Sequence, residues 1–452
     1  MKIKFNILMF LIILVFLSSC RFNNKYDVYI LNFKPESATI YKEIVKEYRK
    51  IKNVKIKVET AASGRYEETL IVEMLKSSVP TIFIINGPAG LKSWKDYALN
   101  LSNYHNNYKI EMIDNISNEK LLLREKEDIY GLPSTIEGYG LIYNKLVFNE
   151  YFSLSNRSTS LKSMEEIKSF NELEMIVKDL NEYIIGKKTY SNCPNMAKLK
   201  RVFSLVSLKS GSDWPYQTHL SSVAMFYEFN ELGNEFLGID TKTIKFKYNM
   251  NMKKMFDLYL EYSNYDKNKL GDVSYDDSLN SFINGSAAII QQGNWIASTI
   301  LNDENTKLGP FDIGMIPIYM GVKAEEKYGI AIGTENYFAV NKTCTKKQIK
   351  ESVDFLNWLY TSDKGKDYVI NALGYIPPYI NFEYEFTNLL NESIIKYMND
   401  KNLDPVEWSF NYYPTESFKT DFGGDLLDYA LGKKTWTEIV NNFIKRWKED
   451  SK

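Results

Sequence analysis

Strand and helix patterns alternate at the start of the chain, and this alternation limits the fold more than any other feature. Residues 26–33 predict a strand, residues 36–51 place apolar side chains on one face of a helix, and residues 54–59 predict a second strand. Residues 65–76 then predict another amphipathic helix, and residues 77–87 predict an apolar strand. Strands that alternate with helices form βαβ units around a parallel sheet. The chain therefore predicts an α/β fold.

The loops that follow these strands are candidates to line a ligand cleft. Ligands of open α/β folds bind at the carboxyl ends of the parallel strands. We therefore expect contacts from Asn32, Arg65 and Asn86, which lie in the loops after the first three predicted strands. The alternative for each of them is an ordinary turn residue.

Residues 282–298 predict a tryptophan that is presented on a rigid base. Residues 287–290 suit a buried strand, and Gly293 frees the backbone just before Trp295. The polar neighbours are uncharged and can form hydrogen bonds; they are Gln291, Gln292 and Asn294. A flat indole beside neutral amides suits a sugar ligand, so Trp295 and Asn294 are candidate contacts. The alternative is that Trp295 fills a core.

A second polar and aromatic loop, residues 211–220, opens a predicted helix. Its polar and aromatic side chains include Asp213, Trp214, Gln217 and His219. We expect Trp214 to offer a second stacking surface, Asp213 to contact the ligand and His219 to be structural. Both histidines of the chain lie apart from Cys and Glu clusters, so we expect no metal and no other cofactor.

The first twenty residues predict an export signal. Lys2 and Lys4 precede an apolar run over residues 7–17, which is shorter than the roughly 20 residues that a membrane span needs. The sequence Leu-Ser-Ser-Cys that ends at Cys20 resembles a bacterial lipobox, which implies cleavage before Cys20 and its lipidation. Residues 1–20 are then the signal and residues 21–25 a tether at the extracytoplasmic face of the cell membrane. The alternative is an ordinary cleaved signal.

Composition excludes some partners. The formal net charge of -1 offers no basic field for nucleic acid, and no run after residue 20 is apolar for long enough to cross a membrane. Cys193 and Cys344 are far apart and lack metal-ligand spacing. We expect two unpaired thiols, with a disulfide as the alternative.

Several motifs together resemble the extracellular solute-binding proteins of carbohydrate ABC importers, the family that includes maltose-binding protein. The stretch from Gly285 to Trp295 is similar to its G-x-A-A-(x)n-G-x-W signature, residues 130–145 to its Y-G-L-P … Y-N-K crossing segment, and residues 374–377 to its G-x-x-P turn. The resemblance implies a two-lobed α/β fold in which each lobe is a mainly parallel sheet flanked by helices, and in which hinge segments join the lobes.

The resemblance also implies where the lobes begin and end. The N-terminal lobe is expected to hold residues 26–135 plus 318–362, and the C-terminal lobe residues 138–314 plus 366–452. The chain would cross between them near Glu137, near Pro317 and after Tyr360. We expect the C-terminal tail to cap the second lobe without further chemistry.

Three more candidate contacts follow from the resemblance. Glu137 would lie at the hinge and accept hydrogen bonds from sugar hydroxyls. Glu335 lies in a loop, residues 333–336, that often carries cleft contacts in the family, and Tyr375 belongs to the G-x-x-P turn beside the cleft.

The implied function is the capture of a di- or oligosaccharide for an ABC importer. The protein would be a lipid-anchored monomer without catalytic activity, and its partners would be permease subunits and an ATPase on a separate chain, since this chain has no Walker A sequence. A surface glycosidase is one alternative, but no pair of carboxylates has a defensible setting for it. A receptor for a non-sugar solute, such as a peptide, is the other.

Overall fold

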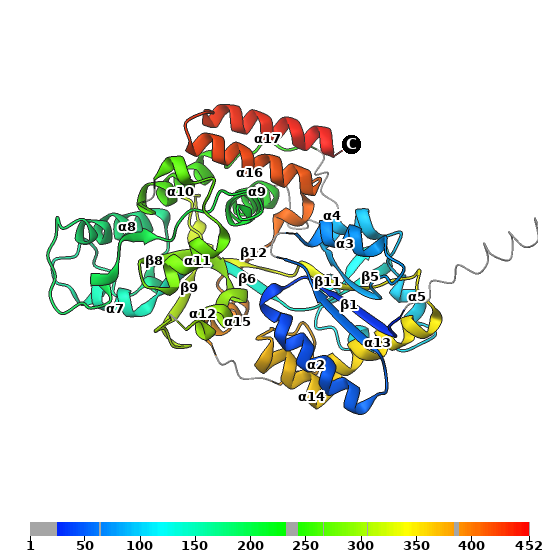
Figure 1. Ribbon diagram of the computed structural model, residues 1–452. Helices are drawn as coiled ribbons and strands as arrows, with labels where there is room; N and C mark the ends of the chain where they lie inside the picture. The colour runs from blue at the N-terminus through cyan, green and yellow to red at the C-terminus, as the bar shows by residue number, and fades with distance from the viewer. Residues whose placement is uncertain are drawn as a thin grey trace, which may run out of the picture.

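The computed structural model describes residues 25–62, 65–231, 243–264, 266–304, 306–383 and 388–451. Two bodies, each built around its own sheet, lie side by side (Figure 1). The predicted two-lobed α/β fold is confirmed. Cys20 lies outside the described residues, so its lipidation stays a prediction.

In the described part of the chain, six strands form the sheet of the first lobe, in the order β2-β1-β3-β11-β5-β4. Their bounds are β1 Val28–Asn32, β2 Ile56–Thr60, β3 Ile82–Asn86, β4 Leu123–Glu125, β5 Asp128–Pro133 and β11 Asn336–Val340. β1 pairs in parallel with β2 and β3, whereas β11 is antiparallel to β3 and β5, and β4 is antiparallel to β5. The βαβ start of the chain is thus present, but it makes only one end of the sheet.

Helices cover the first sheet on both faces. They are α2 Ala38–Ile51, α3 Tyr66–Met74, α4 Gly87–Trp94, α5 Leu101–His105, α6 Glu111–Asp114, α13 Lys346–Thr361 and α14 Asp363–Asp367, followed by a π-helical turn Tyr368–Ala372. The core of this lobe joins side chains from two separate stretches of the chain, among them Val28, Phe83, Phe338 and Tyr360.

The second sheet has the order β12-β10-β6-β8-β7, and β9 also pairs with β6. The strands are β6 Glu137–Asn144, β7 Arg201–Phe203, β8 Ala287–Gly293, β9 Ile313–Ile316, β10 Tyr328–Gly333 and β12 Asp404–Val406. Only the pairs β10 with β12 and β7 with β8 are parallel among the described strands of this sheet. Both sheets are therefore mixed, and the expectation of mainly parallel sheets is wrong.

The helices of the second lobe surround this sheet. They are α7 Lys145–Ser153, α8 Phe170–Ile184, α9 Ser221–Glu231, α10 Asn249–Tyr262, α11 Tyr275–Ile283, α12 Ala297–Asn302, α15 Leu389–Asn399, α16 Glu416–Ala430 and α17 Trp436–Asp450. Side chains alternate across a strand, and in β6 Leu141 and Tyr143 join the large core while Ile142 joins a smaller one. The sheet is thus buried on both faces.

The chain crosses between the lobes at places that differ from two of the three predicted ones. The first crossing, residues 134–136, joins β5 to β6 as expected near Glu137. The second is the two-residue link Thr334–Glu335 between β10 and β11, because β9 and β10 both pair with β6 and keep residues 313–333 in the second lobe. The predicted crossing near Pro317 is therefore wrong.

The third crossing also comes later than predicted. Tyr375, Tyr379 and Phe382 belong to the core of the first lobe, whereas Leu390 and Ile394 of α15 belong to the second. The chain therefore leaves the first lobe after Phe382 and not after Tyr360. The predicted boundaries at residues 318 and 366 shift accordingly.

The structure also bears on the cysteines and on membrane-spanning helices. Cys193 and Cys344 are both described, and they do not form a disulfide with each other. Within the described ranges, none of the helices has the length and apolar character that crossing a bilayer requires.

Two adjacent glycines of α16 give a stability prediction. A Cβ atom at Gly423 would overlap the carboxylate of Asp213, whereas a Cβ atom at Gly424 would meet no atom within 4 Å. We expect Gly423→Ala to lower the free energy of unfolding by about 1–3 kcal/mol, because the buried carboxylate has to move. Gly424→Ala, the matched control, is expected to raise it by up to about 1 kcal/mol through helix propensity. Urea denaturation measures both, and equal effects of the two substitutions would contradict the packing.

Candidate ligand-binding site

A cavity of about 200 Å³ lies between the two lobes. Its walls come from the turn after β1 and the start of α2, from the first crossing, from the segment after β8, and from residues 371–375. The lining residues that carry polar or aromatic groups are Lys34, Glu36, Ser37, Thr135, Glu137, Asn294, Trp295, Ser298, Asn371, Tyr375 and Asn388. Glu137, Asn294, Trp295 and Tyr375 thus share one site, although they are far apart in the sequence.

A buried ion pair forms one wall of the cavity. The Nζ atom of Lys34 lies 2.6 Å from Oε1 of Glu137, and both side chains are more than nine-tenths buried. Burial by itself lowers the pKa of the Lys34 ammonium, but the nearby carboxylates, Glu137 first and then Glu36 and Glu335, outweigh burial and raise this pKa overall. The Lys34 ammonium therefore stays charged at neutral pH and lies against a carboxyl group from the other side of the first crossing.

Asn32 supports this ion pair without lining the cavity. Its Oδ1 accepts from the backbone N–H of Lys34 at 3.2 Å, and its Nδ2 donates to the carbonyl of Lys34 at 2.7 Å and to Oγ of Ser37 at 3.1 Å. These bonds use the amide to hold the turn that aims Lys34. The structure thus gives Asn32 the role of a turn residue.

Trp295 stands at the end of β8 because of local backbone geometry. Its ring folds back over Gly293, where any Cβ atom would collide with the indole. Its Nε1 donates to Oε1 of Gln292 at 3.1 Å, and the ring is half-buried. Asn294 fastens this segment to the hinge, since its Oδ1 accepts from the N–H of Gly138 at 3.2 Å. The indole is therefore held rigidly at the cavity wall.

Trp214 does not line the cavity but packs behind Trp295. The two ring centroids are 5.9 Å apart, and Trp214 also contacts Tyr275 at 5.6 Å and His219 at 5.1 Å. His219 stacks on Tyr139 at 4.2 Å, and burial lowers the pKa of its imidazole to about 3. His219 is thus a neutral structural residue, and Trp214 is a support for the indole in front of it.

Asp213 and Arg65 lie away from the cavity. Asp213 is buried against α16, accepts from the N–H of Gly211 at 3.2 Å, and has its pKa raised to about 6 by burial. Arg65 is exposed at the start of α3, where it forms an ion pair with Glu68. Neither side chain joins the other candidate contacts in this structure.

Glu335 and Asn86 lie in a second polar region between the lobes, which we name the inter-lobe polar cluster. Its members are Asn86, Thr334, Glu335, Asn336, Trp408 and Lys419. The carbonyl of Glu335 accepts from the N–H of Gly87 at 2.9 Å, which ties the second crossing to α4. A Cβ atom at Gly333 would lie 2.7 Å from the ring of Trp408, so the tail packs directly on the second crossing.

The surroundings of Glu335 change its acidity. Burial, with smaller contributions from the carboxylates of Glu416 and Glu137, raises the pKa of Glu335 to about 7, although the ammonium groups of Lys419 and Lys34 oppose the rise. Its protonation therefore changes within the physiological range of pH.

A pH dependence of stability follows from this shift. Because the pKa of Glu335 is about 7 in the folded protein against an ordinary 4.5, the folded state binds more protons than the unfolded state between these values. We expect the free energy of unfolding of the wild type, relative to Glu335→Gln, to fall as pH rises from 4.5 to 7. Urea denaturation at several pH values measures it; parallel curves for the two proteins would contradict the shift.

Sequence reasoning missed Lys34, Glu36, Trp408 and Lys419 as site residues. Lys34 stood inside a loop already expected to line the cleft, so its proximity to Asn32 could have found it. Lys419 gives no comparable signal, because it is one charged residue on a helix that carries many.

Comparison with known proteins identifies the protein family that the chain matches. Residues 43–382 match the protein family described as bacterial extracellular solute-binding protein. No match was found among the curated proteins. The chain is similar to a chitin oligosaccharide binding protein, with 14% identity, a TM-score of 0.70, and coverage of 94% of this chain and 98% of that chain.

Two further solved structures are similar. A solute-binding protein, RafE, in complex with raffinose has 18% identity and a TM-score of 0.67, covering 94% of this chain and 99% of that one. Maltose-bound MalE3 of T. maritima has 11% identity and a TM-score of 0.67, and the match covers 93% of this chain and 99% of that chain. At these identities the likeness shows the fold.

Proposed function

Because the chain belongs to the family of bacterial extracellular solute-binding proteins, we propose that it captures a di- or oligosaccharide in the inter-lobe cavity for an ABC importer. The observation that carries the proposal is the cavity wall formed by Trp295, Asn294 and the Lys34–Glu137 pair, which joins an indole to hydrogen-bonding groups from both lobes. An indole suits a sugar ring, and the polar groups suit its hydroxyls. The solute-binding proteins with bound raffinose and maltose support the same class of ligand.

The mechanism we propose is lobe closure around the ligand. A sugar that contacts Glu137 at the hinge, Trp295 of the second lobe and Lys34 of the first stabilises the closed arrangement over the open one. Residues 134–136 and Thr334–Glu335 are short enough to act as hinges. A permease then recognises the closed form, and its ATPase is another chain. Lipidation of Cys20 would hold the monomeric protein at the extracytoplasmic face of the membrane.

A melting screen tests this function. Ligand at 100 times its Kd adds roughly 2.7 kcal/mol to the stability of the protein. We expect at least one di- or oligosaccharide to raise the melting temperature, and no reducing ends to be released during incubation. Stabilisation by peptides alone would replace the sugar with another solute, and release of reducing ends would indicate a glycosidase.

A further inference from the structure

Glu36 is a carboxylate on the wall of the inter-lobe cavity that the fold does not use. It lies in the turn Pro35–Ser37, and its side chain lines the cavity and is 28% exposed. The turn itself is held by Asn32 and by Oγ of Ser37, which donates to the carbonyl of Lys34 at 2.8 Å. Within the described residues, the carboxylate of Glu36 accepts no hydrogen bond from another residue. It is therefore free to act on a ligand.

Among the described residues, three charged side chains line this cavity, and one of the three is basic. The Nζ atom of Lys34 lies 2.6 Å from Oε1 of Glu137 and 3.9 Å from Oε1 of Glu36. The other described side chains on the wall are uncharged. The single ammonium group therefore faces two carboxylates, and the described wall offers no second cation to meet an anionic ligand.

The carboxylate of Glu36 is unfavourable for the folded protein. Burial raises the pKa of Glu36 above its ordinary 4.5, and the carboxylate of Glu137 adds to the rise, although the ammonium of Lys34 opposes it. A carboxyl group whose pKa rises on folding has an ionised form that is less stable in the folded state than in the unfolded state. Groups perturbed in this way gather at functional sites. The place of Glu36 on the cavity wall thus indicates a role toward the ligand.

We propose that the cavity admits uncharged saccharides and rejects acidic ones, because Glu137 and Glu36 both face Lys34, and that Glu36 is the residue that sets this selectivity. The proposal rests on the sugar-binding function proposed above and names its substrate class. A carboxylate or phosphate of a ligand would meet two like charges and an ammonium that already has a partner at 2.6 Å. A charge left unpaired away from water is costly. The hydroxyl groups of a neutral sugar, in contrast, donate to carboxylates and accept from an ammonium.

Titration calorimetry at pH 7.5 tests the proposal with saccharides that differ in charge at one position. Each saccharide that raises the melting temperature is oxidised at C6 to the uronic acid, and the acid is compared with its own methyl ester. We expect the acid to bind the wild type at least about 100-fold more weakly than the ester, because like charges placed together are strongly unfavourable. Glu36→Gln is expected to reduce this ratio by about tenfold, since one of the two carboxylates is removed.

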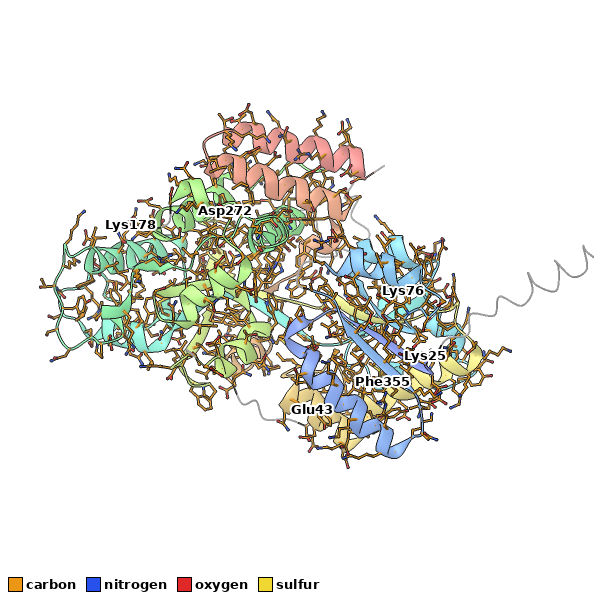
Figure 2. All side chains as sticks on the ribbon, in the orientation of Figure 1. Lys25, Glu43, Lys76, Lys178, Asp272 and Phe355 are labelled. Carbon is orange, nitrogen blue, oxygen red and sulfur yellow. The ribbon has the colours of Figure 1, made fainter. Side chains whose placement is uncertain are left out.

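The control variant is Glu43→Gln, which changes the same type of side chain at an exposed position of α2 (Figure 2). It should leave the ratio between the acid and the ester unchanged. Because the ionised form of Glu36 is unfavourable in the folded state, Glu36→Gln should melt at the same temperature as the wild type or at a higher one. A melting curve of this kind shows that loss of structure does not explain a change in selectivity.

The outcomes separate this proposal from the proposed function. Acids that bind the wild type as tightly as their esters would overturn the selectivity while the sugar-binding function stands. A ratio that Glu36→Gln leaves unchanged would overturn the role of Glu36. If no saccharide binds in any form, both proposals fail.

Discussion

Replacing Trp295 with alanine is expected to weaken saccharide binding by about 30-fold or more, because truncation of a central aromatic contact costs about 2 kcal/mol or more. The indole lines the cavity and is fixed by Gly293 and by its bond to Gln292. No other tryptophan lines this cavity in the described residues, so no second indole can substitute for it. Titration of a saccharide found in the melting screen, followed by calorimetry or intrinsic fluorescence, measures the effect.

The matched control for this substitution is Trp358→Ala. Trp358 is also a partly buried tryptophan, but it packs against Tyr48 and Phe355 in the core of the first lobe. Its loss should lower the melting temperature and leave the Kd unchanged. Equal binding by Trp295→Ala and the wild type would remove the indole from the ligand site.

The second large effect that we expect is a loss of stability when Glu325 is replaced. Its carboxylate accepts from the backbone N–H groups of Phe170 at 2.7 Å, Met320 at 2.7 Å and Gly321 at 2.8 Å, and the residue is 4% exposed. Glu325→Ala leaves these donors unpaired, and each unsatisfied buried group costs about 1–3 kcal/mol. We expect the free energy of unfolding to fall by about 3 kcal/mol or more.

The neighbouring Glu326 provides the control, because it is exposed and adjacent in sequence. Glu326→Ala should change the free energy of unfolding by no more than about 0.5 kcal/mol, as is usual at the surface. Urea denaturation of both variants measures the difference. A loss below about 1 kcal/mol for Glu325→Ala would mean that water satisfies the freed N–H groups.

Local patterns were sufficient to predict elements but not their partners in the sheets. The apolar run before Trp295 and the βαβ start are visible as periodicity, and both occur as expected. The sequence predicts a loop at residues 333–336 and a strand after it, yet β10 and β11 belong to different sheets and only Thr334 and Glu335 separate them. An alternating pattern indicates a strand, but it does not indicate to which lobe the strand belongs. The sequence therefore misplaced the second crossing near Pro317.

Site prediction was limited in the same way. The strand-end rule located the right loops, but the direction of each side chain depends on the turn that holds it. The amide of Asn32 is used by its own turn, and Arg65 points to Glu68 in solvent. Four predicted contacts line one cavity because the hinge and the G-x-W segment are close in space. They are Glu137, Asn294, Trp295 and Tyr375. Lys419 reaches the region from the far end of the chain, and only tertiary packing brings it there.

The central place of β11 affects how the protein is made. β11 lies between β3 and β5, so the first lobe cannot complete its sheet until residue 340 has left the ribosome. Until then the facing edges of β3 and β5 remain open, and open strand edges invite wrong pairing and aggregation. The nascent chain therefore carries an unfinished first sheet throughout the synthesis of residues 134–335.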